Sequence, residues 1–217
     1  MKKIKHVVIS GNIGVGKTTL SKRISEKFNW DLELEEVKNN PYLNDFYNSM
    51  SKWSFHLQIY FLNSRFNQIQ KISESKKTVI QDRSIYEDYE VFTKTLYDSG
   101  LMKRREFNSY KKLYNTILKY IKKPDLIIFL RNDNIEKIIN NIKKRRRNFE
   151  REIDKNYLIE LNKYYSRWIK NHNKKNIIEI DLTKNDFVKD QDILKRVFDS
   201  IESKINDLNW MIILCSV

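Results

Sequence analysis

A glycine-rich loop between an apolar strand and a helix constrains this fold more than any other part of the sequence. Residues 11–18 read Gly-Asn-Ile-Gly-Val-Gly-Lys-Thr and hold three of the chain's four glycines. The pattern G-x-x-x-x-G-K-[ST] is a phosphate-binding loop, whose backbone N–H groups wrap a phosphate at a helix N-terminus. Apolar spacing predicts a strand before it, at 4–10, and a helix after it, at 17–28. Strand, loop and helix are the setting that this motif requires.

The loop predicts binding of a nucleoside triphosphate, ATP, together with Mg²⁺. Lys17 would reach the β- and γ-phosphates, and the hydroxyl of Thr18 would be a ligand of Mg²⁺. We expect nucleotide contacts from Gly11, Asn12, Ile13, Gly14, Val15, Gly16, Lys17, Thr18 and Thr19. The alternative is an ordinary glycine-rich turn that happens to precede a lysine.

Composition excludes several other kinds of site. The 217 residues suit one domain with a substantial core. A single cysteine, Cys215, excludes an internal disulfide and a cysteine-built zinc site, and the three histidines lack metal-ligand spacing. We expect no signal peptide, and the apolar run Trp210–Leu214 is too short to span a bilayer. We therefore expect a cytoplasmic protein with no membrane partner.

The net charge of +14 could mark a nucleic-acid-binding surface. Lysine, asparagine and isoleucine are abundant along the whole chain, however, and the basic residues do not gather in one tail. We favour a protein without a nucleic-acid partner and keep nucleic-acid binding as an alternative.

Short apolar strands alternate with helical patterns, which predicts a parallel sheet covered by helices on both faces. The predicted strands are 4–10, 31–37, 77–82, 125–131 and 176–182. The predicted helices are 17–28, 42–49, 52–74, 85–98, 103–122, 134–147, 155–172 and 190–207. We expect one three-layer α/β/α domain over 1–217, of the P-loop NTPase class, with a five-stranded parallel sheet. Its site should lie at the carboxyl ends of the strands, at Gly11–Thr18, Glu35-Glu36, Asp82-Arg83 and Arg131.

Carboxylates follow the second and third strands. Alternation predicts that Glu33 and Glu35 share one side, where a carboxylate could accept the proton of an attacking hydroxyl; a solvated strand end is the alternative. Ser84 and Glu87 form a capping box that starts the next helix. Asp82 before it would stand near Mg²⁺, and Arg83 would point at the transferred phosphoryl group or the base. A surface salt bridge is the alternative.

Two further groups of polar residues lie on predicted helices. Lys143–Arg147 ends a helix, and its arginines either close over the phosphates as a lid (about 143–153) or form a solvated helix end. Gln58 and Arg65 are two helical turns apart and therefore share a face. An amide and a guanidinium beside aromatic residues suit a heterocyclic base, although a polar stripe beside the core would look the same.

With these residues in place, the chain resembles the deoxyribonucleoside kinases, the family of deoxycytidine, deoxyguanosine and bacterial deoxyadenosine kinases. The resemblance runs from the first strand to about residue 187, with the motifs in the family's order. Glu35-Glu36-Val37 is similar to the family's Glu-Pro-Val, whose glutamate is the general base on the 5′-hydroxyl, and this implies that Glu35 is the base. Asp82-Arg83-Ser84 is similar to the family's Glu/Asp-Arg-Ser, with the arginine near the 5′-oxygen and the acid near Mg²⁺.

The resemblance also implies how a nucleoside is held. Tyr47 falls where the family places a tyrosine on the sugar 3′-hydroxyl, and Glu150 resembles the carboxylate that holds the same group. Gln58 matches the glutamine that pairs with the base. Arg65 and Asp88 match the pair beside the base in members that accept purines or deoxycytidine, so the substrate should be one of these rather than thymidine alone.

The lid shows both agreement with the family and departures from it. Arg145 and Arg147 resemble the family's lid arginines. Arg146 and Phe149 replace a small residue and an acid, and Glu36 replaces the proline after the general base. Family members are commonly dimers built through helices, which implies a homodimer.

We therefore expect an ATP- and Mg²⁺-dependent kinase of nucleotide salvage that phosphorylates the 5′-hydroxyl of a deoxynucleoside. The expected catalytic residues are Glu35, Arg83, Lys17, Arg145 and Arg147, with Mg²⁺ on Thr18 and Asp82. The nearest alternative is a thymidylate-type nucleoside monophosphate kinase, against which Glu35 argues because a phosphorylated acceptor needs cations at this place. A nucleic-acid-binding P-loop ATPase and a nucleotide-binding protein without catalysis are the others.

Overall fold

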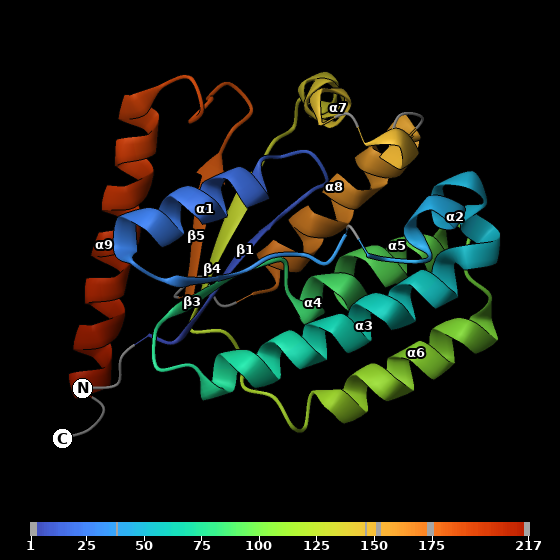
Figure 1. Cartoon of the computed structure of the whole chain (residues 1–217), viewed down its shortest axis with the longest axis horizontal. Helices are drawn as coiled ribbons and strands as arrows, with labels where there is room; N and C mark the ends of the chain where they lie inside the picture. Colours follow the sequence, from blue (N-terminus) through green and yellow to red (C-terminus); the bar gives the residue numbers. More distant parts are fainter. Residues whose placement is uncertain (1–3, 38, 146, 151–152, 173–175, 215–217) are drawn as a thin grey trace.

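The computed structural model describes residues 4–37, 39–145, 147–150, 153–172 and 176–214. Five parallel strands form its central sheet, in the order β2-β3-β1-β4-β5. The strands are β1 (His6–Gly11), β2 (Asp31–Glu33), β3 (Val79–Asp82), β4 (Leu126–Arg131) and β5 (Ile177–Asp181). The predicted five-stranded parallel sheet with covering helices is confirmed (Figure 1).

Helices connect the strands and cover both faces of the sheet. They are α1 (Lys17–Phe28), α2 (Leu43–Asn48), α3 (Met50–Glu74), α4 (Ile85–Glu87), α5 (Lys94–Asp98), α6 (Arg104–Ile117), α7 (Ile135–Lys144), α8 (Lys155–Lys170) and α9 (Gln191–Leu214). A π-helical turn, η1 (Asp88–Thr93), joins α4 to α5, and a 3₁₀ turn, η2 (Asn148–Glu150), follows α7. Among the described residues, no helix is long and apolar enough to cross a membrane.

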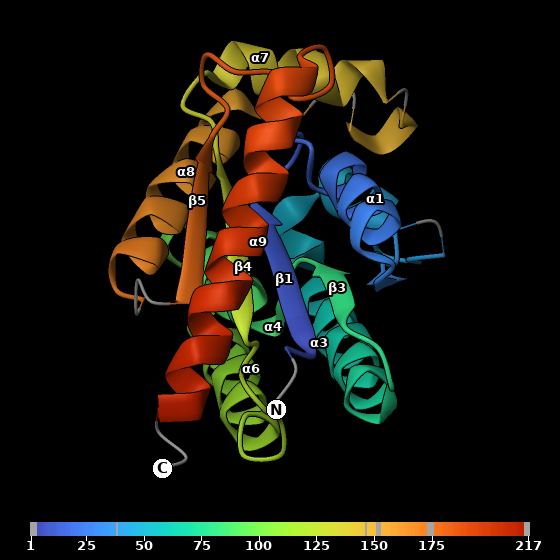
Figure 2. The same cartoon turned by 90° about the vertical axis from the view of Figure 1, so that its left-hand side faces the viewer.

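Alternation along β1 separates two cores. Val7 and Ile9 are fully buried against α1 and α9, whereas Val8 faces the core that includes α3, α5 and α8. Figure 2 shows α1 and α9 in front of the strands. Helix α6 forms an additional layer, because its Tyr110 and Tyr114 pack on Leu62 of α3 rather than on the sheet (Figure 1). The carboxyl ends of the strands stay open between the two helical layers.

The second strand is shorter than the predicted 31–37. Its last pair joins Glu33 to Gln81 of β3. Strand β3 ends one residue later, at Asp82, and the next residue, Arg83, has a left-handed φ of 73°. The extended conformation of the third strand stops at Arg83, and Leu34–Val37 continues as a loop outside the sheet. Glu35 therefore lies in a loop and not on a strand face shared with Glu33.

Three predicted helices also differ from the structure. The helix predicted at 85–98 contains the π-helical turn η1, and the one predicted at 103–122 ends at Ile117. The helix predicted at 190–207 continues as α9 to Leu214, and the apolar run that starts at Trp210 is therefore helical. Of the sequence-selected residues, Arg146 and Cys215 lie outside the described part of the chain.

Candidate active site

A cavity of ≈ 510 Å³ opens at the carboxyl ends of β1, β2 and β3. That volume is typical of a small-molecule site. The walls come from the P-loop, the loop after β2, α2, α3, η1 and the segment after α7. The predicted site residues among its lining are Ile13, Lys17, Thr18, Glu35, Tyr47, Gln58, Asp82, Arg83, Asp88, Arg145, Arg147 and Glu150.

The P-loop holds its lysine and its hydroxyl toward this cavity. Lys17 Nζ donates to the carbonyls of Gly11 and Asn12, each at 2.9 Å. Burial, assisted by the nearby Arg83, lowers the pKa of Lys17 to about 7, although the carboxylates of Asp82, Glu35 and Glu87 oppose this shift. The buried ammonium therefore lacks the anionic charge that would keep it fully protonated at neutral pH, and this charge is what a triphosphate provides.

Glycine is required at two turns of the loop. Gly14 has φ +80°, and a Cβ there would lie 2.9 Å from the carbonyl oxygen of Ile138 in α7. Gly16 has φ +110° and packs on Phe187. The amide of Asn141 donates to the Gly14 carbonyl at 3.1 Å. Helix α7 thus lies against the loop so closely that only glycine fits.

The carboxylate of Glu35 forms ion pairs with two arginines of the site. Its Oε1 lies 2.8 Å from Arg65 Nη2 and 3.2 Å from Arg83 Nε, and its side chain is 20 % exposed. Burial by itself would raise the pKa of Glu35, but attraction to Arg83 and Arg65 outweighs this and lowers it to about 2. Glu35 is thus an ionised acceptor facing the cavity at any physiological pH.

Arg83 is held in an unusual backbone conformation. Its φ of 73° is rare for a residue with a side chain. The backbone N–H donates to Ile9 at 2.9 Å, and the guanidinium lies 4.1 Å from the centre of the Phe92 ring. These contacts turn the side chain back over the sheet toward Glu35.

The capping box predicted at Ser84 and Glu87 is present. Glu87 is fully buried and also accepts from the hydroxyl of Tyr165 at 2.8 Å and from the N–H of Gly11 at 3.4 Å. The sequence identified Glu87 only as a helix cap. In the structure it also ties β3 to the P-loop and to α8, a role that residue spacing does not reveal.

Gln58, Arg65 and Asp88 lie together, but not all of them face the cavity. Gln58 and Asp88 line it, whereas Arg65, 1 % exposed, lies beneath and forms an ion pair with Asp88 over 3.3 Å. The Gln58 carbonyl oxygen lies 3.2 Å from the hydroxyl of Thr93. Burial raises the pKa of Asp88 to about 6, although Arg65 opposes this. The π-helical turn, which the sequence did not indicate, places Asp88 and Thr93 on this side.

Tyr47 and the predicted lid residues lie together on another wall of the cavity, away from Gln58 and Asp88. Arg147 donates to Glu150 Oε1 at 3.1 Å, and Glu150 is 4 % exposed. The Tyr47 ring stacks on Phe149, with centres 6.0 Å apart. Burial, Tyr157 and Glu150 raise the pKa of the Tyr47 hydroxyl, so it remains a neutral hydrogen-bond donor. Tyr157, which also lines the cavity, has no signal in the sequence that distinguishes it from a core aromatic residue.

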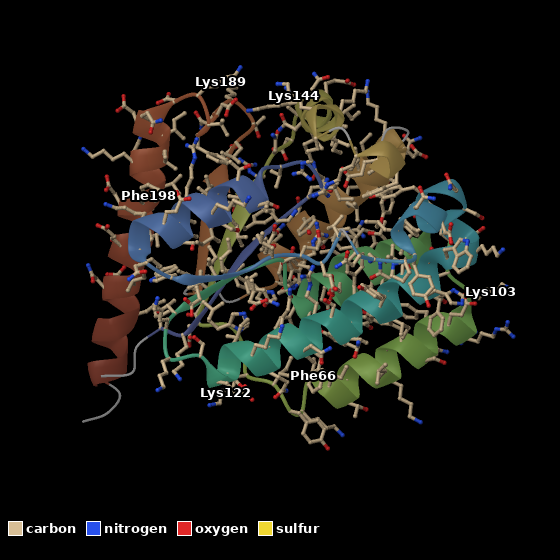
Figure 3. All side chains as sticks on the ribbon, in the orientation of Figure 1. Phe66, Lys103, Lys122, Lys144, Lys189 and Phe198 are labelled. Carbon is tan, nitrogen blue, oxygen red and sulfur yellow. The ribbon has the colours of Figure 1, made fainter. Side chains whose placement is uncertain are left out.

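Some sequence-selected positions lie elsewhere. Arg131 forms ion pairs with Asp133, Glu179 and Asp181 at the end of β4 and does not line the cavity. Thr19 of the P-loop is exposed. In Figure 3 the labelled Lys103 and Lys122 lie at different edges of the molecule, and Lys144 and Lys189 lie near one another at the top of the view.

The residues at Thr18 and Asp82 fit Mg²⁺. The Thr18 hydroxyl donates to Asp82 Oδ2 at 2.5 Å. Oδ1 of the same carboxylate is buried and has no hydrogen-bond partner in the described part of the protein. A hydroxyl and a carboxylate oxygen beside a phosphate site are the oxygen donors that Mg²⁺ prefers. No cluster of three or more histidine, cysteine or carboxylate residues suggests another metal site among the residues described.

The deoxynucleoside kinase family model matches residues 7–206 of this chain. A deoxyadenosine/deoxycytidine kinase of Bacillus subtilis (strain 168) is 36 % identical over 203 residues, which cover 93 % of each chain. A deoxyguanosine kinase of the same organism is 29 % identical and covers 88 % of this chain and 93 % of its own. A solved deoxyadenosine kinase from M. mycoides, with dCMP and a flexible dCDP bound, superposes with a TM-score of 0.81 at 29 % identity and covers 91 % of this chain and 98 % of its own.

Proposed function

This chain belongs to the deoxynucleoside kinase family, and we propose that it transfers the γ-phosphoryl group of ATP to the 5′-hydroxyl of a purine deoxynucleoside or deoxycytidine. The observation that carries the proposal is the Glu35 carboxylate, held at the cavity by Arg65 and Arg83. An anion at this place accepts a proton from a hydroxyl and repels a phosphorylated acceptor. A monophosphate kinase would need the opposite charge here.

Glu35 is the general base in this proposal. Its oxygen would accept the proton of the 5′-hydroxyl as the new P–O bond forms, and Arg83 would stabilise the negative charge that develops around the attacking oxygen. Because the two arginines keep Glu35 ionised, it is a weak base. Positioning of the hydroxyl should therefore contribute more to the rate than proton transfer.

Three cationic side chains of the cavity would stabilise the γ-phosphoryl group during its transfer. Lys17, Arg145 and Arg147 line the cavity and would neutralise charge on the equatorial oxygens of the γ-phosphate. Thr18 and Asp82 would hold Mg²⁺. When bound, Mg²⁺ supplies charge neutralisation on the β- and γ-phosphates. Helix α7 packs against the P-loop, which carries Lys17 and Thr18.

Sugar and base would be read by neutral and anionic groups of the lining. Tyr47 and Glu150 would hold the 3′-hydroxyl, and Gln58 and Asp88 would hydrogen-bond the base edge, with Arg65 behind them. Relatives named for deoxyadenosine, deoxycytidine and deoxyguanosine support this substrate class. We further propose one domain over 1–217 with its lid at about 143–153, a homodimer, and a role in cytoplasmic nucleotide salvage, as the family resemblance implies.

Comparing acceptors tests the proposal. ADP release with Mg²⁺-ATP would be measured against each of the four deoxynucleosides, their 5′-monophosphates and single-stranded DNA. We expect turnover with deoxyadenosine, deoxyguanosine or deoxycytidine and little with thymidine. Turnover only with monophosphates, or stimulation only by DNA, would overturn the proposal in favour of the two alternative enzymes.

A further inference from the structure

A chain of buried amide side chains runs from the start of β1 to the loop that carries Glu35. His6 Nε2 lies 2.9 Å from Gln81 Oε1, and Gln81 Nε2 donates to Gln68 Oε1, also at 2.9 Å. Gln68 Nε2 in turn donates to the carbonyl of Leu34 at 2.7 Å. His6, Gln81 and Gln68 are 8 %, 0 % and 6 % exposed, so water does not compete for these hydrogen bonds.

Gln68 reaches Glu35 along two routes. One is the backbone, because Leu34 immediately precedes Glu35. The other is Arg65, whose Nη1 donates to Gln68 Oε1 at 3.2 Å while its Nη2 donates to Glu35 Oε1 at 2.8 Å. A single amide therefore holds both the loop and the guanidinium that orients the carboxylate.

The loop needs such a contact because it has left the sheet. Strand β2 ends at Glu33, whose register partner is Gln81, and Leu34–Val37 lies beyond the ladder. A ladder hydrogen bond would normally fix the carbonyl of a strand residue; here the side chain of Gln68 does so. The position of Glu35 thus depends on a side chain of α3 rather than on strand pairing.

The direction of the whole chain is fixed at its Gln68 end, by Arg65 and the carbonyl of Leu34. Gln68 must present its oxygen to Arg65 and Gln81 and its nitrogen to Leu34, so Gln81 must present its oxygen to His6. His6 must then carry a proton on Nε2. Burial lowers the pKa of His6, while Gln81 and Asp125 oppose this. A neutral ring protonated on Nε2 satisfies every group, whereas a flipped amide would bring two donors or two acceptors together.

We propose that Gln68, buttressed by Gln81 and His6, is a positioning residue that sets the place of Glu35 and Arg65 for the phosphoryl transfer. The inference rests on the proposed function, in which Glu35 is the general base. The competing view is that these amides only hold β1, β3 and α3 together. The two views differ in whether a change at Gln68 acts through Glu35.

A double-mutant cycle on kcat distinguishes the two views. Gln68→Met keeps the length of the side chain and removes its hydrogen bonds. We expect kcat to fall by about 10–100-fold, because misplacement of a reacting group by about 1 Å costs up to that factor, with the KM for ATP unchanged. In a Glu35→Gln background, the same substitution should cost almost nothing further. Gln70→Met, the same substitution at an exposed position of the same helix, should leave kcat unchanged.

Equal losses from Gln68→Met in both backgrounds, or no loss in either, would overturn the proposal. If Gln68→Met does not fold, two variants at His6 provide the test. His6→Gln keeps a hydrogen-bond donor near the Nε2 position, and His6→Leu removes it. The proposal expects His6→Gln to retain more of kcat than His6→Leu at matched melting temperature, and equal values would refute it. A wild-type protein that does not phosphorylate deoxynucleosides would instead refute the proposed function.

Discussion

Arg65 Nη2 donates to Oε1 of Glu35 at 2.8 Å from a side chain that is only 1 % exposed. The guanidinium is thus buried behind the carboxylate, which faces the cavity. A buried charge that lost its partner would be costly, so this pair is expected to remain formed throughout the catalytic cycle. It keeps the proposed base ionised and in one place, and it connects that base to Asp88 and Gln68.

Replacing Glu35 tests the proposed base. Glu35→Gln should lower kcat by about 10²–10⁴-fold, the usual contribution of a general base, while ATP binding stays close to wild type because the P-loop is untouched. The control is Glu36→Gln, the same change at the adjacent carboxylate, which also lines the cavity but accepts from Ser64 at 3.1 Å and pairs with neither arginine. Steady-state kinetics and ATP titrations measure both. Comparable turnover in the two variants would dismiss Glu35 as the base.

Protonation of Asp88 should determine how the KM for the nucleoside changes at low pH. The pKa of Asp88 is raised to about 6, whereas that of Glu35 is about 2. As the pH falls through 6, Asp88 takes up a proton, loses its negative charge and becomes a weaker hydrogen-bond acceptor for the base. The KM for the nucleoside should therefore rise below pH 6 while kcat stays level.

The variant Asp88→Asn tests whether Asp88 is the group whose protonation raises the KM at low pH. This variant should show a raised KM at pH 8 and no further rise as the pH is lowered. A wild-type KM that is independent of pH between 5 and 8, or an unchanged rise of the KM at low pH in the variant, would contradict the assignment.

Lys17 should take up a proton when ATP binds. Burial lowers its pKa to about 7, so in the free protein a large fraction is neutral at pH 8. Triphosphate oxygens beside it favour the charged form and raise that pKa. Calorimetric titrations with Mg²⁺-ATP at pH 8, in two buffers of different ionisation enthalpy, should show uptake of nearly one proton. Uptake should vanish at pH 5.5, where the lysine is already charged, and in Lys17→Met; uptake that persists in the variant would assign the proton to another group.

Glycine substitutions test the packing of α7 on the P-loop. Gly14→Ala places a Cβ at left-handed φ and 2.9 Å from the Ile138 carbonyl oxygen, whereas Gly100→Ala places one at φ +71° with nothing within 4 Å. The conformational term, about 1–2 kcal/mol, is common to both. Overpacking should cost Gly14→Ala about 1–3 kcal/mol more. Urea denaturation measures the free energy of unfolding of each variant. Equal decreases in the two variants would mean that α7 shifts away from the added methyl group without loss of stability.

Local sequence patterns predicted most of the fold. The P-loop fixed the start of α1 at Lys17, and five apolar runs gave the five strands, because strand–helix alternation requires a parallel sheet. The end of β2 could not be predicted, since it depends on where its pairing with β3, some fifty residues away, stops. Likewise, the π-helical turn at Asp88 satisfies the same apolar spacing as an α-helix and becomes evident only when tertiary packing is known.

The candidate site was predictable wherever a motif marks it. Lys17, Thr18, Glu35, Asp82 and Arg83 belong to motifs that end a strand or follow one, and the structure brings them to one cavity. The burial of Arg65 and the chain from His6 through Gln81 to Gln68 were not predictable. Each of these residues is an ordinary polar side chain in its own segment, and only the packing of α3 on β1 and β3 brings them together.

The most direct test of the account is whether the acceptor is a 5′-hydroxyl. ADP formation and nucleotide product would be quantified with the preferred deoxynucleoside, its 5′-monophosphate and its 5′-deoxy analogue, which lacks only the hydroxyl that we propose faces Glu35. We expect one nucleoside 5′-monophosphate to form for each ADP with the first compound, and no phosphoryl transfer to the other two. Efficient phosphorylation of the monophosphate, or transfer to the 5′-deoxy analogue, would contradict the account.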